Sequence, residues 1–161
     1  IYEGVELAEG FSKSLDNREK ELNKMFPNTK VNFIKDDVKY YDFKNCSLVT
    51  SIFTLQFMSM KDRENIIKKI YNGLNVGGGF LFAEKLICTN AKLQEMMTFN
   101  YYDYKRKHFE AKDIMDKERT LRHMLKPNTW KEIKTMILNA GFQDVQCFWS
   151  NHLFVGALAI K

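Results

Sequence analysis

Cysteine and histidine are scarce in this sequence, with three residues of each. Cys46, Cys88 and Cys147 form no CxxC pair, and none stands beside a histidine at the spacing of a zinc site. The histidines are equally dispersed, so the sequence predicts no metal site. Because each cysteine falls in an apolar stretch, we expect buried free thiols in a protein of the reducing cytoplasm.

Long apolar runs are also missing, and none approaches the roughly 18 to 20 residues that a membrane-spanning helix needs. No Walker loop, nucleophile elbow or Ser-His-Asp order is present, which leaves P-loop nucleotide hydrolysis and triad hydrolysis without support. The run Gly77–Gly79 follows a predicted helix and precedes a predicted strand, the reverse of the order in a phosphate-binding loop. We interpret it as a structural turn.

The composition is that of a folded globular chain. Its 161 residues are 45% hydrophobic and 14% aromatic, which suffices for the core of one domain or most of one. We therefore expect a single domain over residues 1–161, and because Ile1 opens a predicted strand, we expect part of the fold upstream. The net charge of +5 fits solvated helix faces as well as a nucleic-acid-binding patch, and the sequence leaves both open.

Strand and helix patterns alternate along the chain. The hydrophobic spacing predicts strands at 1–6, 31–34, 48–57 and 80–85, and helices at 11–26, 62–74 and 129–140. The glycines within 75–79 predict a tight reversal, and residues 144–149 and 153–160 predict an antiparallel hairpin. We therefore predict an α/β fold of the Rossmann-like methyltransferase type, with a mostly parallel sheet and a terminal antiparallel hairpin.

Residues 91–125 differ from the rest and predict a helical insertion. Its aromatic and basic cluster consists of Phe99, Tyr101, Tyr102, Tyr104, Lys105 and Arg106. This cluster either stacks on and pairs with an anionic substrate or packs at a dimer seam, and the two roles are compatible. We expect a homodimer, because the aromatic and methionine side chains of the insertion exceed what one small sheet covers.

Ligands of open α/β sheets bind beyond the carboxyl ends of the parallel strands. Glu6 and Leu7 follow the first predicted strand, where a carboxylate accepts hydrogen bonds from a ribose diol. Asp37 and Val38 follow the second strand and suit an adenine amine and ring face. The alternative interpretations are an exposed loop acid and simple turn chemistry.

Two further strand ends carry candidate residues. Thr50, Ser51 and Ile52 come at the end of the third strand, before Phe53–Phe57. Glu84 and Lys85 follow the fourth strand, where an ordinary ion pair is the alternative. Each signal is weak alone, but their recurrence at successive strand ends favours a nucleoside-type ligand.

The same region carries a specific family resemblance. Its motifs are Asn45–Val49, Phe53-Thr-Leu-Gln-Phe57, Lys69-Ile-Tyr-Asn-Gly-Leu-Asn75, Glu84-Lys85, Tyr104–Arg106, Arg119 and the ending Leu158–Lys161. On these residues the sequence resembles the carboxy-S-adenosylmethionine synthases of the class I S-adenosylmethionine (SAM)-dependent methyltransferase superfamily. The resemblance covers essentially the whole chain.

The resemblance implies an enzyme that binds SAM and converts prephenate to phenylpyruvate with loss of carbon dioxide. The carboxyl group is captured on the activated methyl, which gives carboxy-SAM, the donor for wobble-uridine modification in tRNA. A sulfonium makes its methyl protons acidic, and a dry site favours their removal. Since tRNA is the substrate of a downstream enzyme, direct tRNA binding is not required.

The resemblance also implies site residues. The arginine that holds the product carboxylate in the family falls at Arg119, although a shifted gap places Glu118 there instead. The acid at the ribose falls on Glu6, and the Asp-Ile pair near adenine falls on Asp37 and Val38.

The sequence departs from the family at several of these positions. Ile52 replaces an asparagine that contacts the cofactor, and Glu6-Leu7 replaces an Asp-Asn pair. The glycine-rich segment and a tyrosine that also contact the ligand are expected upstream of Ile1. Three alternatives therefore remain: part of an active synthase, an ordinary methyltransferase acting on a small molecule or tRNA, and a non-catalytic domain of the same fold.

Overall fold

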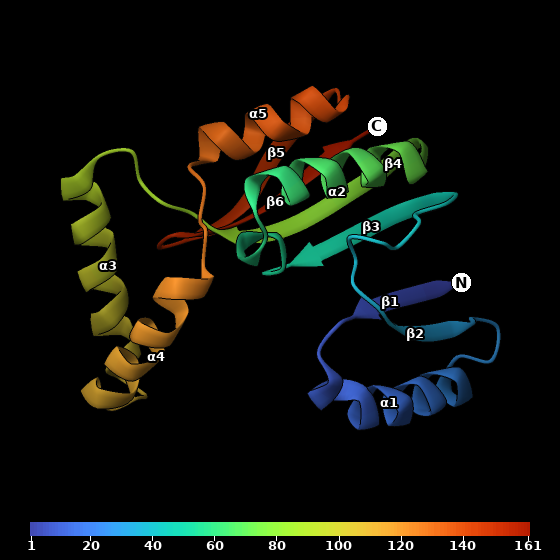
Figure 1. The fold of residues 1–161 in the computed structure, drawn as a ribbon, viewed down its shortest axis with the longest axis horizontal. Helices are drawn as coiled ribbons and strands as arrows, with labels where there is room; N and C mark the ends of the chain where they lie inside the picture. The colour runs from blue at the N-terminus through green and yellow to red at the C-terminus, as the bar shows by residue number, and fades with distance from the viewer. The chain divides into compact units, whose positions relative to one another are not determined.

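The computed structural model describes residues 1–161 and contains two compact units, Ile1–Asp42 and Phe43–Lys161 (Figure 1). No helix in either unit combines the length and the apolar character needed to cross a membrane. The single domain expected for the whole chain stays a prediction.

The first unit is a pair of parallel strands with one connecting helix. The elements are β1 (Tyr2–Glu6), a 3-10 turn (Glu9–Phe11), α1 (Ser12–Met25) and β2 (Val31–Lys35). The predicted strand–helix–strand order is confirmed. The Asn23 amide of α1 exchanges two hydrogen bonds of 2.9 Å with the backbone of Val31, which ties the helix to β2.

The second unit is built on a four-stranded mixed sheet. Its strands in spatial order are β3 (Cys46–Ile52), β4 (Leu74–Lys85), β6 (Phe154–Ile160) and β5 (Asp144–Asn151). β3 and β4 are parallel, whereas β6 runs antiparallel to both of its neighbours. The predicted terminal hairpin is therefore confirmed.

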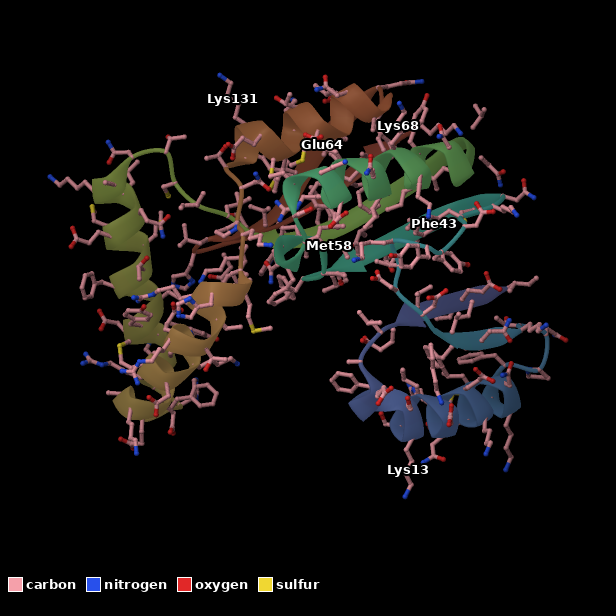
Figure 2. All side chains as sticks on the ribbon, in the orientation of Figure 1. Lys13, Phe43, Met58, Glu64, Lys68 and Lys131 are labelled. Carbon is pink, nitrogen blue, oxygen red and sulfur yellow. The ribbon has the colours of Figure 1, made fainter.

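Two helices cover one face of this sheet. α2 (Met60–Gly73) and α5 (Trp130–Ala140) pack side by side on it (Figure 1). Their buried side chains and those of β4 form the core: Ile66, Ile67, Ile70, Ile133, Met136, Ile137, Phe80 and Phe82. Glu64 and Lys68 of α2 and Lys131 of α5 project from the opposite, exposed helix faces (Figure 2). This is the division that the three- and four-residue spacing predicts.

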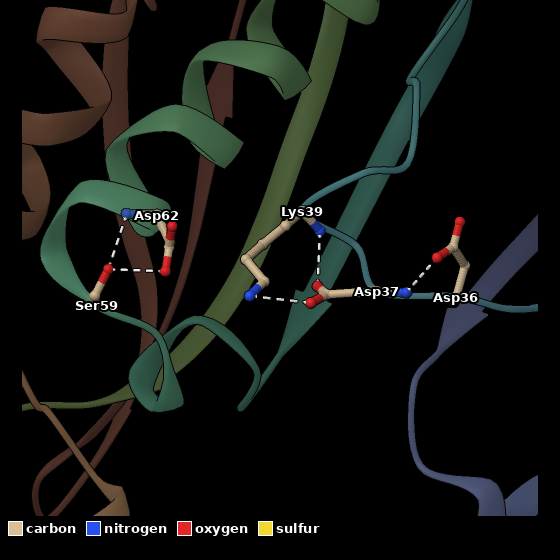
Figure 3. Close-up of polar contacts among 5 residues, drawn as sticks. All are labelled: Asp36, Asp37, Lys39, Ser59 and Asp62. Atoms are coloured by element: carbon tan, nitrogen blue, oxygen red, sulfur yellow. Dashed lines mark hydrogen bonds and ion pairs between the residues drawn. The ribbon is translucent and has the colours of Figure 1, made fainter.

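Side-chain caps set the starts of both helices. The Ser59 hydroxyl accepts the Asp62 N–H at 3.2 Å and donates to the Asp62 carboxylate at 2.8 Å (Figure 3). Thr129 and Glu132 form the predicted capping box at α5. Gly141 ends α5 with a φ of 116°, a conformation that favours glycine.

Two expectations about strand ends are wrong. The run at 48–57 is not one strand, because Phe53 takes a φ of 55° and Leu55–Phe57 forms a 3-10 turn. The glycine run is not a loop that precedes the next strand. Leu74 already pairs with Cys46, and the predicted tight reversal at 75–79 is instead a bulge within β4, where the register shifts and Gly77 has a φ of 77°.

The predicted helical insertion is confirmed as α3 (Ala91–Lys105) and α4 (Ala111–Met124).

The prediction of buried thiols needs correction, since the three cysteines are free but partly exposed. Cys46 begins β3, Cys88 follows β4 and Cys147 stands at a register shift in β5. The ends and irregularities of a sheet are less completely covered than its centre.

Candidate functional site

A pocket of about 550 Å³ lies in the first unit at the carboxyl ends of β1 and β2. Its lining residues are Glu6, Leu7, Ala8, Glu9, Ser12, Leu15, Lys35, Asp36, Asp37 and Tyr40. Three of the predicted cofactor-binding residues, Glu6, Leu7 and Asp37, are thus brought together in one pocket. The parallel register explains why: Glu6 stands opposite Lys35, so both strands end at the same edge.

The Glu6 carboxylate is held in place by its own loop. Its Oε1 accepts the backbone N–H of Ala8 at 2.8 Å. A carboxylate has further acceptor capacity in its second oxygen. Glu6, which lines the pocket, therefore combines a fixed position with remaining acceptor capacity.

Asp37 is fixed by a tight turn after β2. Its carboxylate accepts the Lys39 N–H at 2.9 Å and pairs with the Lys39 ammonium at 3.1 Å, while its own N–H donates to Asp36 at 2.7 Å (Figure 3). The backbone hydrogen bond from Lys39 is the main reason why the pKa of Asp37 lies below its usual value. Both carboxylate oxygens of Asp37 are thus engaged by Lys39, and each keeps further acceptor capacity.

Val38 and Tyr40 belong to the same turn, which the Tyr40 N–H closes on the Asp37 carbonyl at 2.8 Å. Val38 is half-buried and does not line the pocket, whereas Tyr40 lines it with a ring that is 76% exposed. Tyr40 was not among the predicted site residues. Its signal was the Asp-Asp-x-x-Tyr turn itself, which places an aromatic ring beside two carboxylates.

Ile52, the predicted cofactor-binding residue of the second unit, ends β3 and is 51% exposed. The next residue, Phe53, donates its N–H to the Ala83 carbonyl at 2.8 Å and then turns away from the sheet. Two side chains hold the 3-10 turn that follows: Glu84 accepts the Leu55 N–H at 3.1 Å, and Gln56 accepts the Lys85 N–H at 2.7 Å. This edge of the second sheet is thus rigidly built.

Glu84 and Lys85 do not form the ion pair that one interpretation predicted. Adjacent strand residues point to opposite faces, and Glu84 is buried beneath α2 near Arg63 while Lys85 contacts Glu118. Burial raises the pKa of Glu84 to about 7, and the Arg63 charge opposes that rise. Arg63 is itself buried, with donors satisfied by three backbone carbonyls, Leu55, Met58 and Lys126.

Arg119, the residue aligned with the carboxylate-binding arginine, lies on the exposed face of α4. Its side chain is 80% exposed and reaches Asp116 of the same helix at 3.5 Å. Glu118, the alternative in the shifted register, faces inward and contacts Lys85 and Lys105. The structure therefore does not bring Arg119 to the end of β4.

Synthases of carboxy-S-adenosyl-L-methionine are similar to this chain over most of its length. It is 38% identical over 132 residues to the one from Staphylococcus epidermidis, 33% over 159 residues to that from Nautilia profundicola, and 32% over 162 residues to that from Campylobacter concisus. These matches cover 81%, 98% and 100% of this chain. The chain spans 58%, 66% and 67% of the length of these relatives. No protein-family model matches it.

Solved methyltransferases share the fold. Human N-acetylserotonin methyltransferase in complex with SAM superposes with a TM-score of 0.55 at 16% identity, covering 82% of this chain and 34% of that one. An O-methyltransferase family 2 protein from Planctomyces limnophilus in complex with apigenin superposes with a TM-score of 0.64 at 13% identity. The match covers 100% of this chain and 42% of that one. The predicted methyltransferase fold is confirmed.

Proposed function

Because this chain belongs to the carboxy-S-adenosyl-L-methionine synthase family, we propose that it is the SAM-binding part of a transferase that makes carboxy-SAM. The acidic partner of SAM is prephenate, which loses its ring carboxyl group as carbon dioxide and its ring hydroxyl as hydroxide and leaves as phenylpyruvate. The methyl carbon of SAM gives up a proton and bonds to the carbon dioxide, and the proton and the hydroxide leave as water. The product serves tRNA wobble-uridine modification, and the enzyme acts in the cytoplasm as a homodimer. The observation that carries the proposal is the pocket where Glu6 and Asp37 meet.

The acceptor groups of this pocket fit a nucleoside. Glu6, fixed by its bond to Ala8, offers a carboxylate oxygen to the ribose hydroxyl groups, and Leu7 borders them. Asp37 accepts the adenine amine, and Val38 lies in the same turn. When bound, SAM supplies a sulfonium-activated methyl group.

Arg119 is the proposed partner of the product carboxylate. A guanidinium suits that task because it donates two parallel hydrogen bonds to a carboxylate. Its single ion pair, with Asp116 at 3.5 Å, leaves most of its donors available to a ligand.

The test is to incubate the complete gene product with SAM and prephenate and to weigh the nucleoside product. A mass gain of one carbon dioxide on SAM, together with release of phenylpyruvate, is expected. SAM that is bound but unaltered would contradict the proposal. Arg119→Gln should lower product formation, whereas Arg18→Gln, which changes an exposed arginine of α1 paired within its own helix, should not.

A second candidate is an ordinary SAM-dependent methyltransferase. The exposure of Arg119 favours it, because transfer of a neutral methyl group needs no carboxylate clamp. In this case the same incubation with a methyl acceptor yields S-adenosylhomocysteine and no carboxylated nucleoside.

A further inference from the structure

Two lysines in the second unit share one carboxylate oxygen. The ammonium groups of Lys85, at the end of β4, and Lys105, at the end of α3, lie 3.7 and 3.9 Å from Oε1 of Glu118. All three side chains are largely buried, with 17%, 14% and 17% of their surface exposed. Two positive charges therefore stand against one negative charge, away from most of the solvent.

The two N···O distances to Glu118 are longer than a hydrogen bond, and one carboxylate oxygen cannot accept from all the N–H groups of two ammonium ions. A charge-assisted N–H···O bond is typically about 2.7–2.9 Å long. Neither the Lys85 nor the Lys105 ammonium donates a hydrogen bond to a protein group, so their N–H groups are available to a ligand. Burial lowers the pKa of Lys105, and Lys85 and Lys117 add to this lowering.

Aromatic rings surround the same place. The Lys105 ammonium lies 4.3 Å from the centre of the Tyr101 ring. The centre of the Tyr101 ring lies 5.4 Å from that of Phe154, and the Phe154 ring centre lies 5.6 Å from that of Phe53. His152 stands beside Tyr101 at 5.3 Å. A series of contacting rings thus extends from Phe53, next to Ile52 at the end of β3, to the ammonium groups of the two lysines.

We propose that Lys85 and Lys105 bind a carboxylate of an organic acid whose ring packs against Tyr101 and its aromatic neighbours. A carboxylate has two oxygens, each able to accept more than one hydrogen bond, which matches two ammonium groups with unused donors. The surplus positive charge beside Glu118 provides the attraction, and the rings select an acid with a cyclic body. This site rests on the proposed function only in assigning the acid as the partner of SAM.

The test uses 3-phenylpropanoate as probe in a ligand-observed NMR titration of the complete gene product. Lys85→Gln and Lys105→Gln should each weaken binding at least about tenfold, since a hydrogen bond to a charged group is lost. Glu118→Gln should tighten binding several-fold, because it removes the competing negative charge. The control variant Lys112→Gln changes an exposed lysine of α4 and should leave the affinity unchanged.

The opposite sign for Glu118→Gln separates binding from a structural role, which every substitution would only impair. The neutral 3-phenylpropanamide should not compete with the probe. Absence of binding to the wild type, equal binding by the lysine variants, or competition by the amide would overturn the site. If the lysine variants melt early by circular dichroism, Glu118→Gln decides alone, and unchanged or weaker binding then counts against the site.

The two proposals fail separately. If SAM and prephenate give no carboxylated product while the probe binds in the manner described, the site stands and the proposed function falls. If product forms with the same KM for prephenate in wild type, Lys85→Gln and Lys105→Gln, the function stands and the site falls.

Discussion

The buried carboxylate of Glu84 accepts a hydrogen bond of 3.1 Å from the backbone N–H of Leu55, 29 positions earlier in the chain. It thereby joins the end of β4 to the 3-10 turn that follows β3. Gln56 makes the second link between these segments by accepting the Lys85 N–H. The geometry next to Ile52 therefore depends on a titratable group.

We predict that the stability of the second unit falls as pH rises from about 4.5 to about 7. Burial raises the pKa of Glu84 from 4.5 to about 7, so in this window the folded state keeps a proton that the unfolded state has lost. Glu84→Gln should remove this slope and, above about pH 7, gain stability of the order of 3 kcal/mol relative to wild type. Urea unfolding of both proteins at about pH 5, 6, 7 and 8 measures this. Parallel pH profiles would show that Glu84 is not the group responsible.

Arg63→Met should destabilise the fold by about 3–5 kcal/mol. The substitution leaves the Leu55, Met58 and Lys126 carbonyls without their donor and Glu84 without its nearest positive charge. Urea unfolding near neutral pH measures the loss. Lys68→Met, an exposed change on the same helix, should stay within about 0.5 kcal/mol of wild type. A loss no larger than that of this control would mean that the buried network contributes little.

The order of the elements could be predicted from the sequence because it depends on local patterns. Isoleucines at three- and four-residue spacing predict α2, and the Thr129–Glu132 box predicts where α5 begins. The wrong predictions concern ends set by distant partners. Phe53 leaves the sheet where Glu84 holds the turn after it, and Leu74 enters β4 because Cys46 pairs with it.

The candidate site divides in the same way. Glu6 and Asp37 could be predicted because Glu6 ends β1 and Asp37 stands two residues after β2, and a parallel register brings both strand ends to one edge. The inward orientation of Glu118 could not be predicted. Adjacent helical residues point about 100° apart, and only the packing of α4 decides whether Glu118 or Arg119 faces Lys85.

Thr129→Ala and Glu132→Ala should each lower stability by about 1 kcal/mol, and the double variant should lose less than the sum. The two residues satisfy each other's backbone: Thr129 Oγ1 accepts the Glu132 N–H at 3.2 Å, and the Glu132 carboxylate accepts the Thr129 N–H at 2.8 Å. Thermal unfolding of the four proteins gives the coupling. Strict additivity would show that the box does not act as a unit.

Glu6→Gln and Asp37→Asn should each weaken SAM binding by about tenfold, because a hydrogen bond to a charged acceptor is worth roughly 1.5–3 kcal/mol. The amide in Glu6→Gln can still accept the Ala8 N–H, and the amide in Asp37→Asn can still accept the Lys39 N–H, so both loops should keep their shape. Calorimetric titration of the complete gene product with SAM measures the affinities. Glu21→Gln, which changes an exposed acid of α1 paired with Arg18, is the matched control. Affinities equal to that of the control would place the nucleoside outside this pocket.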